Sequence, residues 1–211
     1  MEKFHNELED LKKQVLDMGF HALDMLNSSI EAFKNLNIYH SEEIYSRKDK
    51  LMEYDNRNEE KALQLIALYQ PMARDLRIIA CILKMITYLT RIGRYGKDIT
   101  NITTKELEGK IHFKKIVSIP HMMSIVNGMI KNALVAFDKS DISFLKDFEE
   151  RDDEVDELRL SIFRECLTYM MESPANISIC IAYIMIARYL ERCGDHACKM
   201  AEKIHYMITG E

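Results

Sequence analysis

The sequence predicts an all-α protein made of two tandem three-helix bundles related by internal duplication. Gly and Pro contribute only 7 and 3 of the 211 residues, whereas the two together average roughly 12% of soluble chains. So few turn-forming residues argue against a β-sandwich and favour long helices. Apolar residues recur at steps of three and four, and similar segments reappear about a hundred residues apart.

The first helix is predicted from an apolar seam that crosses the N-terminal segment. Its positions step by three and four residues and are apolar except for Ser29. They are Leu8, Leu11, Val15, Met18, Ala22, Met25, Ala32 and Leu36. Such a seam packs against other helices at a shallow angle, and Asn35 and Asn37 mark its end.

Five further helices are predicted from the Pro, Gly and capping residues that separate them. The second spans about residues 41–69, and Pro71 ends it and suits the first turn of a third helix that runs to about 104. Gly109 and Pro120 interrupt the middle of the chain. The remaining helices are expected at about 120–138, 141–172 and 174–208, the last opened by Ser173 and Pro174 as N-cap and first residue.

The duplication sets the domain organisation. A shift of 104 residues pairs Met25 with Met129 and Leu63 with Leu167, and a shift of 101 pairs residues 88–93 with 189–194. We therefore expect one unit over residues 1–108 and a second over 109–211. Each is long enough for a core of its own, and neighbouring helices should be antiparallel because the connections are short.

Composition excludes several classes of protein. The net charge of −5 and the pI of about 5.9 do not suit a nucleic-acid-binding protein. The N-terminus carries no secretory signal, and the longest apolar stretch, residues 177–187, is far shorter than the roughly 20 residues that span a bilayer. The five cysteines form no C-x-x-C pair, which indicates reduced thiols in a cytoplasmic protein.

Two motifs resemble those of a known family. One is Tyr69-Gln-Pro-Met-Ala-Arg-Asp-Leu-Arg77, which precedes a long apolar helix, and the other is Leu190-Glu-Arg-Cys-Gly-Asp-His-Ala197. In these places, and along essentially the whole chain, the sequence resembles the PhoU family of phosphate-uptake regulators. The resemblance implies two three-helix bundles in tandem and a metal on a bundle face.

Paired carboxylates supply the candidate metal ligands. Glu191 and Asp195, and likewise Asp152 and Asp156, are four residues apart and so share a helix face. The overlapping pair Asp153 and Glu157 leaves the register of the fifth helix open. Oxygen ligands suit Mg, Ca, Mn or Fe, and the family resemblance adds iron or zinc. The alternative is a solvated acidic face that binds no metal.

The first unit lacks this acidic set. Lys48, Met52, Thr90 and Arg94 stand where the second unit has its four carboxylates. We therefore expect at most one metal site per chain. Lys48 and Arg94 are expected instead to form salt bridges, with attraction of an anion as the alternative. The expected partners are Asp49, Glu53 and Asp98.

The resemblance also points to partner contacts near the third helix. It implies that Arg74, Asp75 and Arg77 contact another protein, whereas the simpler explanation for Asp75 is favourable placement in the first turn of a helix. The second unit has Pro174-Ala-Asn-Ile-Ser178 at this place, so any such role belongs to the first unit alone.

The resemblance implies a regulatory protein with no catalytic residues. We expect a negative regulator of phosphate uptake and phosphate-starvation signalling. It would bind the ATPase of the phosphate ABC transporter and a sensor histidine kinase, and it would be a cytoplasmic homodimer, peripheral at the inner face of the membrane. The alternative is an adaptor for another membrane transporter, such as a sodium- or proton-coupled phosphate carrier or a potassium channel.

One class of enzyme shares a motif with this sequence. Di-iron oxidases carry Glu-x-x-His on two helices, and Glu2 with His5 and Glu202 with His205 match that spacing. Both pairs lie at the chain ends, where helices fray, so an oxidase is not expected. His196 is turned off the Asp195 face by one residue of helix rotation and is expected in the core or at its rim.

Overall fold

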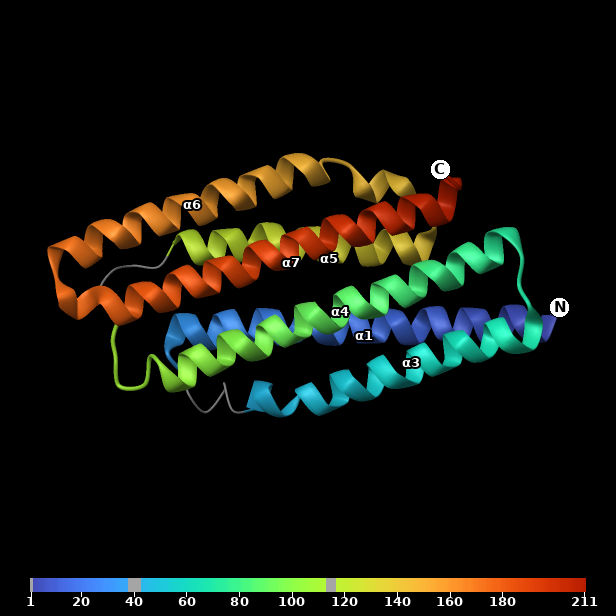
Figure 1. The fold of residues 1–211 in the computed structure, drawn as a ribbon, viewed down its shortest axis with the longest axis horizontal. Coiled ribbons are helices and arrows are strands. Elements are labelled where there is room, and N and C mark those ends of the chain that lie inside the picture. The colour runs from blue at the N-terminus through green and yellow to red at the C-terminus, as the bar shows by residue number, and fades with distance from the viewer. Residues whose placement is uncertain (1, 38–42, 113–116) are drawn as a thin grey trace.

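The computed structural model describes residues 2–37, 43–112 and 117–211. Six long helices fill most of these residues, and none of the described residues lies in a strand. The helices are α1 (Glu2–Asn35), α3 (Lys48–Tyr69), α4 (Ala73–Lys105), α5 (Ser118–Lys139), α6 (Phe148–Glu172) and α7 (Ile177–Thr209). Figure 1 shows them running along one long axis, with α1, α3 and α4 on one side and α5, α6 and α7 on the other.

Helix ends differ from the sequence prediction at four places. The second predicted helix, expected from about residue 41, is continuous only from Lys48, where α3 begins. Pro71 precedes α4 instead of occupying its first turn, because α4 begins at Ala73. The fifth predicted helix begins seven residues late, since the 3₁₀ turn η1 (Ile142–Leu145) and a left-handed Asp147 come before α6. Pro174 opens the short 3₁₀ turn η2 (Pro174–Asn176), which leads into α7.

The packing confirms the predicted fold class. In each half, the three helices contact one another, and the halves join where α4 packs on α7 and α1 packs on α5. The apolar seam of α1 is buried from Leu8 to Ala32, including its polar exception Ser29, and Leu36 beyond the helix end is partly buried. One continuous cluster of buried side chains runs through both halves, so the two repeats share a core where they meet.

Glycine sets the closest approach between α1 and α4. A Cβ added to Gly96 would lie 3.0 Å from the backbone of Met25 and Leu26. A side chain at this position would therefore push the two helix backbones apart.

His112, in the connector between the repeats, contacts both repeats. Its Nε2 lies 3.1 Å from the Phe33 carbonyl oxygen at the end of α1, and its Nδ1 lies 2.6 Å from the Tyr183 hydroxyl on α7. The ring also packs edge-on against Phe33, with centroids 5.3 Å apart. The connector is thereby tied to one helix of each repeat.

Neither a disulfide nor a membrane-spanning helix is present among the described residues. All five cysteines are free thiols, four of them buried and Cys198 half-buried. None of the described helices is long and apolar enough to cross a membrane.

Candidate metal site

The candidate site lies where α6 packs against α7. Gly194 lets the two helices approach closely, since an added Cβ would lie 3.1 Å from the Asp152 Oδ1 atom and 3.6 Å from the Val155 Cγ1 atom. The carboxylate of Asp152 therefore rests against the backbone of α7. In the first repeat Leu51 meets Gly93 in the same way, which fixes the equivalence of the two halves.

The four predicted carboxylates lie in one electrostatic field. Burial raises the pKa of Asp152, and the charges of Asp195 and Asp156 raise it further. Burial likewise raises the pKa of Glu191, with Asp195 adding to the effect. Asp195 and Asp156 thus lie close enough to act on the charges of both Asp152 and Glu191. Asp152 is half-buried, whereas Asp153 and Asp156 are both exposed. Of the residues in the two overlapping pairs on α6, Asp152 is the one whose carboxylate lies against Gly194 of α7.

Two arginines partly neutralise this cluster. The Arg159 Nε atom lies 3.9 Å from Glu191 Oε1, and Arg192 lies 3.7 Å from both Glu191 Oε2 and Asp195 Oδ2. Within the three described ranges, no three His, Cys, Asp or Glu side chains are arranged closely enough to hold a metal. A cation would require Arg192 to release its two carboxylates.

The thiol of Cys198, which lies beside Asp152, does not add a charged ligand. Burial, followed by the Asp152 carboxylate, raises the pKa of Cys198 to about 12, so the thiol stays protonated at neutral pH. The charged donors at the site are therefore carboxylate oxygens, which suit hard or borderline cations.

The equivalent place in the first repeat is built differently. Thr90 donates a hydrogen bond of 2.6 Å to Asp55, where the second repeat has Glu191 beside Arg159. Arg94 lines a hollow of about 280 Å³ with Asp55 and Thr90. The Thr90–Asp55 pair was missed from the sequence because Asp55 matches no acidic residue in the second repeat.

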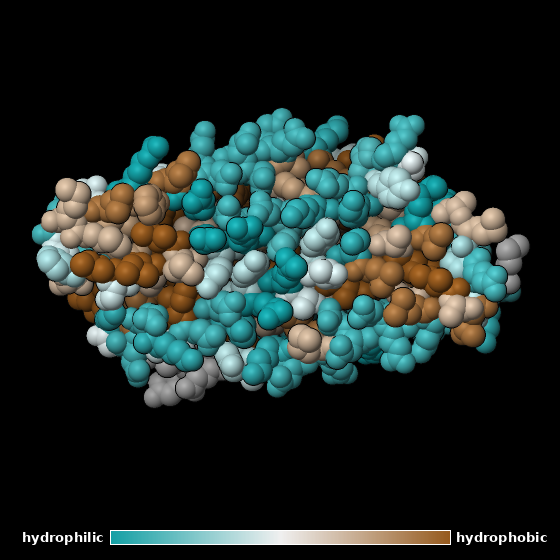
Figure 2. All heavy atoms as spheres, viewed as in Figure 1, coloured by the Kyte–Doolittle hydropathy of each residue, from teal (hydrophilic) through white to brown (hydrophobic). Residues whose placement is uncertain are grey.

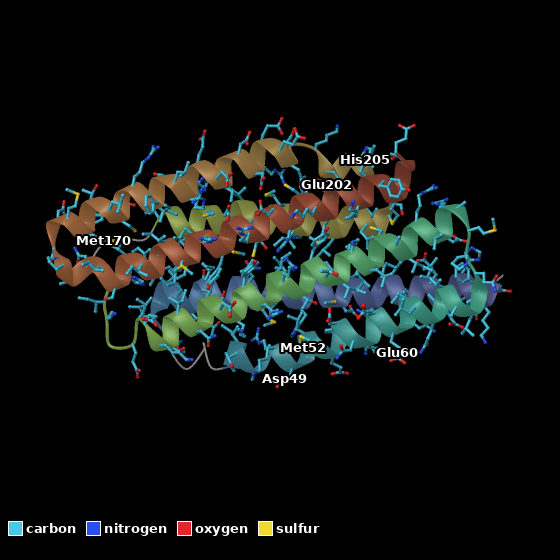
Figure 3. All side chains as sticks on the ribbon, in the orientation of Figure 1. Asp49, Met52, Glu60, Met170, Glu202 and His205 are labelled. Carbon is cyan, nitrogen blue, oxygen red and sulfur yellow. The ribbon has the colours of Figure 1, made fainter. Side chains whose placement is uncertain are left out.

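The predicted salt bridges of the first repeat are wrong. Asp98 pairs with Lys97 at 2.8 Å and not with Arg94. Lys48 places its ammonium 4.4 Å from the centre of the Tyr45 ring and pairs with no carboxylate of the described residues. Asp49 and Met52 lie on the first turns of α3 (Figure 3).

His196 lies in the core, as predicted. Its side chain is only 4% exposed and stacks on Tyr88 of α4, away from α6. Burial lowers its pKa to about 4, so the ring is neutral at physiological pH. It takes no part in the carboxylate cluster.

The family model of the PhoU domain matches residues 15–103 and again residues 119–204. The chain belongs to the PhoU family. Each match covers the three helices of one repeat, so the family's repeated domain coincides with the duplication seen in the fold.

Two relatives support the assignment along the whole of this chain. The chain is 33% identical over 210 residues to a phosphate-specific transport system accessory protein PhoU homolog of Rhizobium meliloti, covering 100% of this chain and 89% of that protein. It is 36% identical over 211 residues to the corresponding homolog of Caulobacter vibrioides, covering 100% and 92%.

Solved PhoU structures have the same fold. The crystal structure of PhoU from Pseudomonas aeruginosa superposes with a TM-score of 0.94 at 30% identity, covering 99% of this chain and 100% of that one. PhoU from Streptococcus pneumoniae superposes with a TM-score of 0.89 at 22% identity, covering 99% and 98%.

This PhoU-family protein is accordingly an accessory, regulatory protein of phosphate transport and not an enzyme. The two Glu-x-x-His pairs have separate surroundings, which agrees with that class. His5 lies 3.7 Å from Asp75, whereas Glu202 and His205 line a hollow beside Phe148 (Figure 3).

The three predicted contact residues of the PhoU motif have different surroundings. Arg74 is exposed. Asp75 faces His5 of α1, and the Arg77 guanidinium lies against Gly210, with its Cζ 3.5 Å from where a Cβ would be. Arg77 thus places a positive charge at the C-terminal end of α7, where the helix dipole favours it. Of the three side chains, Arg74 is the most open to a partner.

Proposed function

We propose that this protein is a negative regulator of phosphate uptake and phosphate-starvation signalling. It acts at the cytoplasmic side of the membrane by binding the ATPase of the phosphate ABC transporter and a sensor histidine kinase. The observation that carries the proposal is the full-length match of both repeats to accessory proteins of phosphate-specific transport systems. The work of such a protein is binding, so its mechanism is a change in affinity between proteins.

The rigidity of the fold suits that role. The continuous core that joins the repeats makes the protein a stiff rod, so the surfaces of both repeats are held at fixed positions. A partner that contacts both repeats meets them without a cost for ordering a hinge. Arg74, at the exposed start of α4, offers one cationic contact at the end of this rod.

The finer part of the proposal is a metal site in the second repeat. Asp152, Asp156, Glu191 and Asp195 would hold the cation, with iron or zinc as the first candidates and Mg, Mn or Ca as the others. When bound, the cation supplies the positive charge that offsets the repulsion among the four carboxylates and links α6 to α7. Arg192 supplies part of that charge in its absence.

Recovery of partners from the native host tests the regulatory role. The tagged protein is purified at high phosphate, and membrane proteins that come with it are identified by mass spectrometry. The proposal expects the transporter ATPase or the sensor kinase, and Arg74→Ala should reduce their recovery without lowering the melting temperature. Recovery of only a carrier or a channel would overturn the proposal in favour of the adaptor alternative.

Equilibrium dialysis against Fe²⁺, Zn²⁺, Mn²⁺ and Mg²⁺, followed by elemental analysis, tests the metal site. Asp195→Asn and Asp156→Asn should abolish stoichiometric binding. Asp153→Asn is the matched control, because Asp153 is an adjacent exposed carboxylate, and it should bind as wild type does. Equal loss in all three variants would mean a diffuse acidic surface instead of a site.

A further inference from the structure

The outer face of the second repeat combines an apolar patch with an acidic stretch. On α6 the exposed apolar side chains are three or four residues apart and lie on one side of the helix. Two isoleucines on the adjoining start of α7 extend the patch. Its members are Leu160, Phe163, Leu167, Met171, Ile177 and Ile181, each more than 40% exposed. Figure 2 shows apolar surface gathered at the end of the molecule where α6 turns into α7.

The acidic stretch continues the same helix face. Asp153 and Glu157 precede Leu160 by seven and three residues, so they lie in line with the patch, and both are exposed. Residues 147–157 carry eight carboxylates and a single basic side chain, Arg151. This face of α6 is therefore acidic in the first half of the helix and apolar in the second.

The first repeat shows that the bundle itself requires neither feature. At the positions that correspond to Leu160, Phe163, Met171 and Ile181 it has Asn56, Glu59, Ala67 and Ala80, whereas at those of Leu167 and Ile177 it keeps the exposed apolar residues Leu63 and Leu76. Residues 43–53, which correspond to the acidic stretch, contain three acidic and three basic side chains. Two repeats of one fold thus share a buried core but differ on this face.

We propose that this face is the docking site for an amphipathic helix of a partner protein, with an apolar seam and a cluster of Lys or Arg at one end. The apolar seam lies along the patch, as in other helix-in-groove complexes. The basic end lies over Glu157 and Asp153, about 5 and 10 Å beyond the nearest apolar anchor, Leu160, given a rise of 1.5 Å per residue. The inference rests on the proposed regulatory function, because it gives the chemistry of the partner segment.

Charge argues against a second copy of this chain as the occupant. A second copy would bring the same acidic stretch, on a molecule whose net charge is −5. Two such faces repel each other, whereas a basic helix is attracted to the acidic half and buries its apolar side on the other. The face is therefore complementary to a basic segment and not to itself.

The test uses the full-length chain and random peptides of about 20 residues displayed on phage. The proposal expects enriched peptides with apolar residues at helical spacing and Lys or Arg at one end. A synthetic copy of the most enriched peptide is then measured by fluorescence anisotropy. Absence of enrichment, or enrichment of peptides without the basic end, would overturn the proposal.

The duplication supplies matched controls. Leu167→Glu should weaken the peptide at least about tenfold, as expected for an apolar anchor, whereas Leu63→Glu, at the equivalent position and 53% exposed, should change its affinity less than about twofold. Asp153→Lys should weaken binding and reduce its salt dependence, whereas Asp49→Lys should do neither. Equal effects within either pair would exclude this face.

The outcomes separate the two proposals. If the native host yields the transporter ATPase and Leu167→Glu leaves peptide binding unchanged, the docking face is wrong and the regulatory function stands. If the peptide binds as described and the host yields only a carrier or channel, the docking face stands and the regulatory function is wrong.

Discussion

Tyr88 on α4 stacks on His196 on α7, with ring centroids 5.6 Å apart and an interplanar angle of 22°. Tyr95 stacks on Tyr189 at 5.4 Å and 24°. When the repeats are aligned at a shift of 101 residues, Tyr88 corresponds to Tyr189 and Tyr95 corresponds to His196. The second contact therefore joins the same two positions as the first, with the repeats exchanged. The two repeats thus meet across an approximate two-fold axis, and the histidine is the one member that breaks the pattern.

Replacing His196 with phenylalanine should stabilise the protein. Both ring nitrogens are buried with no hydrogen-bond partner in the described structure, and an unsatisfied buried polar group costs about 1–3 kcal/mol. His196→Phe keeps the ring on Tyr88 and removes both nitrogens. Urea unfolding at pH 7.5 should show a gain of about 1–2 kcal/mol. A loss instead would mean that the nitrogens are hydrogen-bonded, for example to buried water.

A methyl group at Gly96 should separate α1 from α4. The added Cβ would meet backbone atoms at 3.0 Å, which cannot rotate away as a side chain can, so Gly96→Ala should cost about 2 kcal/mol or more. Gly128→Ala is the control, since its nearest neighbour is the Arg151 guanidinium at 4.0 Å. There alanine should gain up to about 1 kcal/mol from its higher helix propensity. Equal changes in the two unfolding curves would contradict this packing.

Much of the fold followed from local pattern, because burial in a helix bundle follows the step of three and four residues. The α1 seam is the clearest case, and Leu11, Val15 and Met18 are fully buried as predicted. The late start of α6 was not predictable, since the acidic residues around Asp147 fit a helix as well as a turn. Asp147 is left-handed and follows η1, which packs against α5 and α7, contacts that local sequence does not specify.

The paired spacing of the carboxylates can be read from the sequence, but the arginines that partly neutralise them cannot. Spacing placed Glu191 and Asp195 on one face, whereas the approach of Asp152 depends on the contact with Gly194. No pattern in the sequence indicated that Arg159, on a different helix, reaches Glu191. Contacts between long side chains of separate helices depend on rotamers and crossing geometry, which helical periodicity does not encode.

The contacts of His112 should make stability depend on pH. Burial lowers the pKa of His112 below its ordinary value of 6.5. The unfolded chain therefore binds the proton first, and the stability from this group is present above about pH 6.5 and is lost as the pH falls. His112→Phe should lower the free energy of unfolding by about 1–2 kcal/mol at pH 7.5, since two hydrogen bonds are lost.

The variant should also lose less stability than wild type between pH 7 and pH 5. Urea unfolding across this range provides the measurement. His205→Phe, at an exposed position on the last turns of α7, is the control and should follow the wild-type profile. Parallel profiles for wild type and His112→Phe would show that the ring is not held in its neutral form by this contact.

Giving the first repeat the four carboxylates of the second should allow it to bind a metal, provided that Asp55 is changed as well. Lys48→Asp, Met52→Asp, Thr90→Glu and Arg94→Asp supply the four carboxylates. The new side chain at position 90 would meet Asp55, which now accepts the Thr90 hydroxyl at 2.6 Å; the second repeat has Arg159 at the corresponding place. Like charges in contact are unfavourable, so the four changes alone should destabilise the chain.

Adding Asp55→Arg should restore stability and raise the stoichiometry from the proposed one metal per chain to two. Equilibrium dialysis with elemental analysis measures the stoichiometry, and urea unfolding compares the sets with and without Asp55→Arg. A second metal in the four-change variant would show that the arginine is dispensable for the site. No metal in any variant, wild type included, would mean that the carboxylates of the second repeat are neutralised by Arg159 and Arg192 alone.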